Sequence, residues 1–153
     1  FENVAFPLRR HTTLANDAIA KRVSECLAMV ELEKGVAAKM PNELSGGMRR
    51  RVGFARAIAN RPEILLFDEP NTGLDPITSA VIDHDIEVMR REAGATMVII
   101  THDTKSAFRI GTRIAMLKDG RILAEGAPDE FRKSSEPYVQ KFLAGEPLEG
   151  EAP

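Results

Sequence analysis

The stretch that decides the fold is residues 64–70, Ile-Leu-Leu-Phe-Asp-Glu-Pro. A short, wholly apolar run between Pro62 and Pro70 is typical of a strand that is buried on both faces of a parallel sheet. Asp68 and Glu69 follow at the carboxyl end of this strand, where open α/β sheets place their ligands. We therefore expect an α/β fold with an acidic pair at its functional edge.

The segments around this strand predict further elements of an α/β chain. Residues 96–100 predict a second buried strand, because they are apolar and rich in β-branched side chains. Pro7 is expected to prevent a helix in residues 1–13, which show no clear period. Helices are expected from three starts, namely Asn16 as an N-cap, Ser45, and Asp75 with Pro76 at the first helical position and Gly94 near the end.

The C-terminal third predicts smaller elements. A short helix is expected at residues 104–110, and Asp119-Gly120 predicts a two-residue hairpin turn between strands 114–117 and 122–124. Short helices at 129–134 and 138–143 follow, and the tail is expected to be disordered. The predicted organisation is a helical subdomain (1–60), the C-terminal part of a core (61–144) and a tail (145–153).

Composition narrows the class of protein. The 153 residues carry 21 basic and 23 acidic side chains, and this net charge of −2 argues against a dominant electrostatic attraction to nucleic acid. No apolar run approaches the roughly 20 residues of a membrane helix. The single cysteine, Cys26, cannot form an internal disulfide, which fits a reducing compartment. Phe1 is not a methionine, so we expect that it is not the natural start.

The stretch Leu44-Ser45-Gly46-Gly47-Met48 stands at the head of a predicted helix. Glycines let a backbone approach an anion closely, and a helix start offers free N–H groups and a positive dipole end. With the Ser45 hydroxyl as a further donor, the stretch can grip a terminal phosphate. The alternative is an ordinary serine N-cap before a flexible turn.

The acidic pair suits metal and proton chemistry. Asp68 is suited to holding Mg²⁺ through water, and Glu69 to orienting or deprotonating an attacking water. Alternation along an extended segment is expected to point the two side chains apart, so that each serves a different role. The alternative is a solvated acidic turn after a strand.

Two further patterns are weaker alone. Residues 71–76, Asn-Thr-Gly-Leu-Asp-Pro, taken by themselves favour a loop and a helix cap at Asp75. His102 follows the second predicted strand and can donate a hydrogen bond to phosphate, although a lone histidine there is more often structural. Its position beside a strand end, like that of Glu69, favours the functional interpretation.

In this order the four patterns resemble the ATP-binding-cassette (ABC) transporter ATPases, from Phe1 to about Leu143. Leu44–Met48 resembles the signature motif, residues 64–69 the Walker B strand, residues 73–75 the D-loop, and His102 the switch histidine. Residues 119–122 and 125–128 are similar to the closing segment of the family. The resemblance implies a partial P-loop NTPase fold, with parallel strands and a helical signature subdomain.

The resemblance also implies a site and partners. Two cassettes would sandwich two ATP molecules with Mg²⁺, as a homodimer bound to a transmembrane permease at the cytoplasmic face of a bacterial inner membrane. The implied catalytic residues are Glu69 and His102, the implied metal residue is Asp68, and the implied ATP contacts are Ser45, Gly46, Gly47, Met48 and Asp75. Membrane contact would run through the permease alone, and no nucleic acid is implied.

A closer likeness is to the Mla/Mce-type bacterial lipid-transport ATPases. Met48 replaces the glutamine that is usual at the fifth signature position. Three strings carry the likeness, at residues 1–8, 75–78 and 142–147, and it implies phospholipid movement between inner and outer membranes. Two other classes stay open: a soluble ABC protein that acts on ribosomes or DNA ends, and a non-catalytic remnant that only binds a partner.

A P-loop, G-x-x-x-x-G-K-[ST], is missing, because no glycine of the chain is followed by lysine. The Q-loop glutamine of the family is missing too, so we expect the C-terminal part of a cassette that is inactive alone and poorly stable in isolation. Residues 49–51, Arg-Arg-Arg, predict a solvated helix face, against a role near phosphate or a membrane partner. Cys26 is expected in the core, and His11 and His84 have no metal-ligand spacing.

Overall fold

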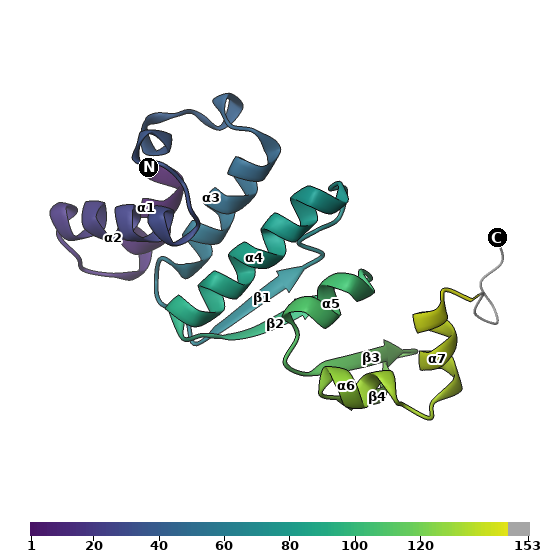
Figure 1. Ribbon diagram of the computed structural model, residues 1–153. Coiled ribbons are helices and arrows are strands. Elements are labelled where there is room, and N and C mark those ends of the chain that lie inside the picture. Colours follow the sequence, from purple (N-terminus) through teal and green to yellow (C-terminus); the bar gives the residue numbers. More distant parts are fainter. Residues whose placement is uncertain (147–153) are drawn as a thin grey trace. The chain divides into compact units, whose positions relative to one another are not determined.

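The computed structural model describes residues 1–146, and the chain divides into one compact unit, Phe1–Ile100, and a second that begins at Thr101. Both units combine helices with strands, and the first holds a parallel pair, which confirms the predicted α/β class (Figure 1). This division does not coincide with the boundary expected after residue 60, which stays a prediction. Each unit is described by itself.

The first unit contains all the longer helices and one parallel strand pair. Strands β1 and β2 pair from Ile64 opposite Thr96 to Asp68 opposite Ile100. In chain order its elements are α1 (Glu2–His11), α2 (Asn16–Met29), the 3₁₀ turns η1 (Lys34–Ala38) and η2 (Pro41–Glu43), α3 (Gly46–Ile58), β1 (Ile64–Asp68), α4 (Pro76–Ala93) and β2 (Thr96–Ile100).

The helix α1 corrects the expectation that Pro7 prevents a helix near the N-terminus. Pro7 lies inside α1, while Val4, Ala5 and Leu8 are buried against α2 and α3. A proline inside a helix costs about 3 kcal/mol, yet tertiary packing of an apolar face supplies most of the stability of protein helices. Packing of this face therefore outweighs the local cost.

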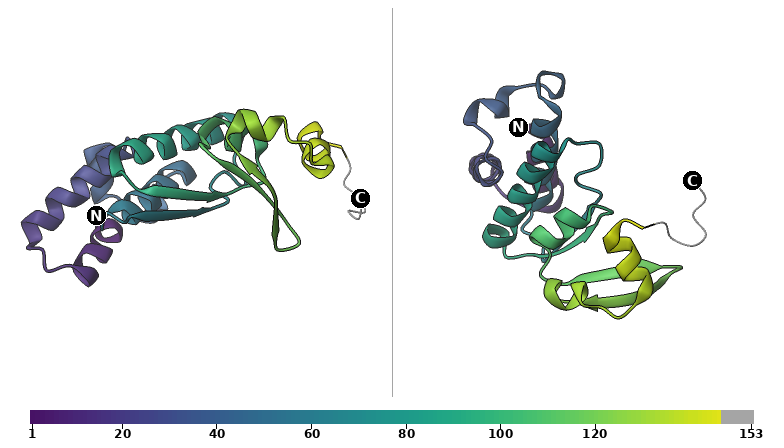
Figure 2. Two further views of the ribbon diagram at one scale, coloured as in Figure 1. Left: turned by 90° about the horizontal axis from the view of Figure 1, so that it is seen from below. Right: turned by 45° about the vertical axis from the view of Figure 1, so that its right-hand side comes forward.

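The strand pair is buried on one face only, which corrects the prediction of burial on both faces. Leu65 and Phe67 are buried, whereas Leu66 is 77% exposed, and exposure alternates along β2 as well. Helix α4 lies across one face of the pair (Figure 2). Within residues 1–100 no element covers the other face, where the exposed side chains are those of Ile64, Leu66, Val98 and Ile100.

Helix α3, which begins at the predicted signature motif, is anchored at both ends of its buried face. The Phe54 ring meets the Phe67 ring of β1 edge-on, with 5.5 Å between centroids. One turn further along, Arg22 of α2 donates to the carbonyl oxygens of Ile58, the last residue of α3, and of Ala59, its C-cap, at 2.8 and 3.0 Å. These contacts hold α3 between the helical layer and the strands.

Helix α2 has one apolar face, on which Ile19, Val23, Cys26 and Leu27 are buried. The core position of Cys26 is confirmed, and burial raises the pKa of its thiol. The predicted cap at Asn16 is wrong by one residue, because Ala15 holds the N-cap position without a side-chain hydrogen bond.

The second unit is built on an antiparallel hairpin. Asp119 and Gly120 have φ angles of 49° and 74°, the left-handed pair that a tight I′-type turn requires. The Phe108 and Phe131 rings pack edge-on at 6.2 Å. The elements are α5 (Thr104–Ile110), β3 (Ile114–Lys118), β4 (Arg121–Gly126), α6 (Pro128–Arg132) and α7 (Pro137–Ala144).

The chain beyond α7 was expected to be disordered from residue 145. Gly145 has a φ of 69° and closes the helix, and the Glu146 N–H donates to the Lys141 carbonyl at 3.0 Å. The rest of that prediction, residues 147–153, lies outside the described residues.

Candidate functional site

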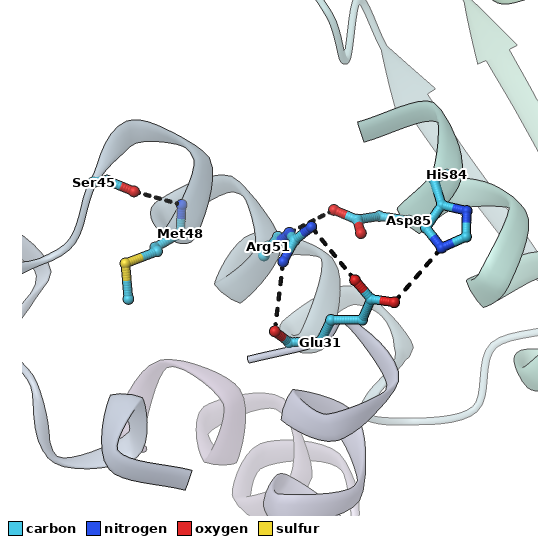
Figure 3. Close-up of polar contacts among 6 residues, drawn as sticks. All are labelled: Glu31, Ser45, Met48, Arg51, His84 and Asp85. Atoms are coloured by element: carbon cyan, nitrogen blue, oxygen red, sulfur yellow. Dashed lines mark hydrogen bonds and ion pairs between the residues drawn. The ribbon is translucent and has the colours of Figure 1, made fainter. Parts of the chain in front are cut away.

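The predicted phosphate-gripping stretch forms the N-terminus of α3. Ser45 is the N-cap, and its Oγ accepts a hydrogen bond from the Met48 N–H at 3.2 Å (Figure 3). The hydroxyl hydrogen of Ser45 therefore remains available for donation to a ligand. The N–H groups of Gly46 and Gly47 belong to the first turn, which has no intrahelical acceptors. The predicted donors thus lie together at one helix end.

Nothing inside the described chain requires glycine at positions 46 and 47. A Cβ atom added at either would meet no atom within 4 Å, and neither residue has a positive φ. Glycine in a helix costs about 0.5–1 kcal/mol relative to alanine. The described chain therefore leaves open space at both glycines, into which a ligand could come.

The predicted acidic pair lies where β1 ends. Asp68 is exposed at the last position of the strand, and the Glu69 N–H donates to the Ile100 carbonyl at 2.9 Å, one step beyond the paired residues. Glu69 is half-buried, and its Oε2 accepts from the Thr72 hydroxyl at 2.9 Å. The two carboxylates thus have different surroundings, as the predicted division of roles requires.

The cause of this difference corrects the sequence prediction. Glu69 has a φ of 48° and is not extended, so strand alternation does not separate its side chain from that of Asp68. A left-handed conformation is costly for a residue other than glycine and is concentrated at functional sites in proteins. The chain turns at Glu69 through this bend, which the sequence did not indicate.

The predicted D-loop runs from β1 into α4. Asp75 caps the helix, accepting from the N–H groups of Ile77 and Thr78 at 2.9 and 3.0 Å. The Thr78 hydroxyl also donates to Asp75, and these hydrogen bonds lower the pKa of that carboxyl. Upstream, the buried Asn71 amide donates to Asp83 at 2.7 Å, which ties the loop to the body of α4.

His102 lies two residues beyond β2, in the second unit, and is exposed. Asp103 beside it caps α5 through the N–H groups of Lys105 and Ser106, and hydrogen bonds from Ser106 and Lys105 hold the pKa of Asp103 below its usual value against the effect of burial. The catalytic role that the family resemblance implies for His102 stays a prediction.

The expected solvated face at residues 49–51 holds for Arg49, which is exposed, but not for Arg51, whose side chain is largely buried. Arg49 donates to the Leu44 carbonyl at 2.7 Å, and Arg50 to the Thr72 carbonyl at 3.4 Å. Arg51 forms an ion pair at 2.7 Å with Asp85, whose side chain is fully buried. Sequence reasoning missed Asp85, although it lies on the apolar stripe of α4, between Ile82 and Met89.

The end of β1 offers Mg²⁺ one suitable ligand, a carboxylate. Residues 1–146 contain no group of three or more His, Cys, Asp or Glu side chains that could hold a metal ion. Mg²⁺ does not need such a cage, because it commonly binds one or two carboxylates together with substrate phosphates and water. The exposed carboxylate of Asp68 meets that requirement. Over the same residues no helix has the length and apolar character to cross a bilayer.

Comparison with known proteins gives a consistent result. A family model described as ABC transporter matches residues 1–72. The chain is 41% identical, over 95% of its length, to the intermembrane phospholipid transport system ATP-binding protein MlaF of Haemophilus influenzae. It is also 41% identical, over 94% of its length, to the spermidine/putrescine import ATP-binding protein PotA of Shigella flexneri.

A solved structure shares the fold. A dimeric ATP-binding cassette, MJ0796, in a post-hydrolysis state with ADP and Pi, is 41% identical and superposes with a TM-score of 0.68 over 83% of this chain. The chain spans about half the length of these relatives: 55% of MlaF, 38% of PotA and 55% of MJ0796. The fold is therefore part of a cassette.

Proposed function

The chain belongs to the ABC transporter family of ATP-binding proteins, and from this premise we propose that it supplies parts of two ATP sites in a cassette dimer. Its α3 start would contact ATP held on the partner cassette, and its β1 end would serve ATP held on its own. The P-loop that both sites need is missing from these 153 residues. A protein that carries this chain together with a P-loop would be the ATPase.

The observation that carries the proposal is the open helix end at Ser45. Ser45, Gly46 and Gly47 offer a hydroxyl and two N–H donors, with nothing in the described chain close to the glycines. A helix start with this character favours an anion. A γ-phosphate brought by a second cassette would account for both the donors and the missing side chains. Met48 and Asp75 are proposed to border the same ATP-binding face.

The end of β1 is proposed to carry out the hydrolytic chemistry. Asp68 would hold Mg²⁺ through water, and the ion would neutralise charge on the phosphates. Glu69 would orient the attacking water and accept its proton, held in place by the Thr72 hydroxyl and the bend at its own backbone. His102 would donate a hydrogen bond to the phosphate.

The test uses the full-length ATPase and Ser45→Arg. We expect the variant to bind ATP as a monomer with unchanged affinity and to lose the ATP-dependent dimer, because the bulky side chain meets the partner's nucleotide. The lost cap costs only about 0.5–2 kcal/mol, too little to unfold the protein. Ala127→Arg, at the exposed N-cap of α6, is the matched control. Equal loss of ATP affinity and dimer, measured by titration and sedimentation, would place Ser45 in the pocket of its own subunit.

The transported substrate is proposed to be phospholipid, moved between inner and outer membranes through a permease at the cytoplasmic face of the inner membrane. Support comes from the name of MlaF and from the strings at residues 1–8, 75–78 and 142–147. The equal identity to PotA makes polyamine the competing substrate. With its membrane partner in vesicles, the full-length ATPase should transfer labelled phospholipid in an ATP-dependent way; spermidine uptake instead would refute the lipid assignment.

A further inference from the structure

One arginine of α3 contacts both neighbouring helices of the first unit. The Arg51 Nε donates to the Asp85 Oδ2 of α4 at 2.7 Å (Figure 3). The same guanidinium donates to the Glu31 carbonyl, just after α2, at 3.5 Å and lies 3.8 Å from the Glu31 carboxylate. His84 of α4 approaches that carboxylate at 3.6 Å. Arg51 therefore connects α3 to α2 and α4 at once.

Asp85 is the more deeply buried partner of this ion pair. Its side chain is fully buried, and the second oxygen, Oδ1, has no hydrogen-bond partner. Burial raises the pKa of Asp85, and Arg51 opposes the rise. A buried ion pair is a weak source of stability, because apolar residues of similar volume are often as good or better. The contribution of the pair is geometric, because a directional hydrogen bond fixes where α3 crosses α4.

The pair lies C-terminal to both helix starts that are proposed to meet ATP, that of α3 and that of α4. Ser45 is six residues before Arg51, which is about 9 Å along the helix. Asp75, the cap of α4, is ten residues before Asp85 and follows the acidic end of β1. A tilt of about 10° at Arg51 would thus move Ser45 by about 1.6 Å.

We propose that Arg51 and Asp85 are positioning residues, which fix α3 on α4 so that the Ser45 end and the β1 end fit two ATP molecules of one dimer. This inference rests on the proposed function. If Ser45 serves one nucleotide and Glu69 the other, a dimer closes only when their spacing within a subunit is right. Misplacement by about 1 Å can lower a rate by about 10²-fold.

The experiment compares single and paired substitutions in the full-length ATPase. Arg51→Met or Asp85→Leu alone breaks the pair, while the double variant replaces both charges by apolar side chains. Arg56→Met, an exposed arginine of the same helix, is the control. The measurements are the thermal midpoint, ATP affinity of the monomer, KM, kcat and the ATP-dependent dimer fraction.

We expect each single variant to lower both the midpoint and kcat. The double variant should recover the midpoint, because no unpaired buried charge remains, while its kcat stays at least about 10-fold low with ATP affinity unchanged. Arg56→Met should match the wild type in all measurements. Recovery of kcat together with the midpoint in the double variant would overturn the proposal and leave the pair a purely structural role.

Two further outcomes are also decisive. If the double variant does not fold, the test uses Arg51→Lys, which keeps the charge but lacks the planar guanidinium. A folded Arg51→Lys variant with wild-type kcat overturns the proposal. A folded variant with lowered kcat supports it. If Ser45→Arg leaves the dimer intact, the proposed function itself fails. If Ser45→Arg blocks the dimer while the double variant behaves as wild type, only the positioning role fails.

Discussion

Leu65 and Leu66 offer a matched test of the one-sided burial of the strands. They are adjacent and of the same type, but Leu65 is 6% exposed and Leu66 is 77% exposed. Alanine at either position removes the same atoms from the same strand. We expect Leu65→Ala to cost about 2–5 kcal/mol of unfolding free energy, because it leaves a cavity in the core.

The cost at Leu66 follows from its exposure. Full burial of a leucine side chain is worth about 1.5–3 kcal/mol, and Leu66 buries about a quarter of its surface, so Leu66→Ala should cost about 0.3–0.7 kcal/mol. The assay is urea unfolding of the 153-residue chain, followed by far-UV circular dichroism with linear extrapolation. A small chain has little stability to lose, so an unfolded Leu65→Ala variant beside a folded Leu66→Ala variant meets the expectation.

Equal costs at the two positions would refute the reasoning, because they would mean that the exposed face is covered in solution. Sedimentation at several concentrations would then detect a second copy on that face, since exposed apolar strand pairs associate readily. In the full-length ATPase, further segments packed over this face would raise the cost of Leu66→Ala to that of Leu65→Ala.

Four further predictions each concern one side chain. In the full-length ATPase, Glu69→Gln should retain ATP binding and lower turnover by about 10²–10⁴-fold, whereas Asp68→Asn should weaken Mg²⁺-dependent binding; near-normal turnover of Glu69→Gln excludes Glu69 as the base. Because burial raises the pKa of the Cys26 thiol, iodoacetamide should modify it at pH 8 only as the chain unfolds, and rapid labelling of folded chain would contradict this. Hydrogen bonds led by that from Thr78 lower the pKa of Asp75, so its stabilising effect holds above the unfolded value of about 3.9 and is lost as pH falls through the lower folded pKa. Asp75→Ala should therefore flatten the acid-unfolding curve below about pH 4, and an unchanged curve would contradict the assignment.

The features that sequence predicted well are set by local hydrogen bonds. Ser45 and Asp75 cap α3 and α4 as expected, because a short polar side chain can bond the free N–H groups of its own helix start. Asp119-Gly120 forms the predicted turn, since both residues tolerate a positive φ. None of these features depends on what packs against the segment.

The predictions that failed depend on contacts between distant segments. Pro7 stays in a helix because Val4 and Leu8 are buried against other helices, which no local rule reveals. The apolar run of β1 indicated burial on both faces, yet Leu66 is exposed because only one face is covered within the described chain. A hydrophobic pattern indicates that a segment needs to be buried, but it does not indicate which other segment covers it.

At the candidate site, too, the local features were predicted and the non-local ones were missed. The positions of Asp68 and Ser45 follow from a strand end and a helix start, and sequence located both. The bend at Glu69 and the buried partner of Arg51 were missed, because a left-handed glutamate and a cross-helix ion pair leave no local pattern. For Asp85 one non-local signal existed: an acid on the apolar stripe of a helix needs a buried cation, and a run of three arginines ends 34 residues earlier in the chain.

Several of the costs that the fold accepts lie at residues for which a function is proposed, although Pro7 in α1 and the left-handed Arg61 lie elsewhere. Gly46 and Gly47 weaken the start of α3 without a packing reason, and Glu69 holds a backbone conformation that is costly for its type. Asp85 is a buried acid with one oxygen unpartnered. Native sequences are otherwise consistent across local and global levels, so several violations within one unit point to selection for something other than stability. Each cost would be compensated by one proposed role. The glycines would admit a phosphate, Glu69 would hold a water, and Asp85 would fix the crossing of α3 over α4. Replacing Gly46 or Gly47 by alanine should therefore stabilise the isolated chain while it weakens the ATP-bound dimer of the full-length ATPase.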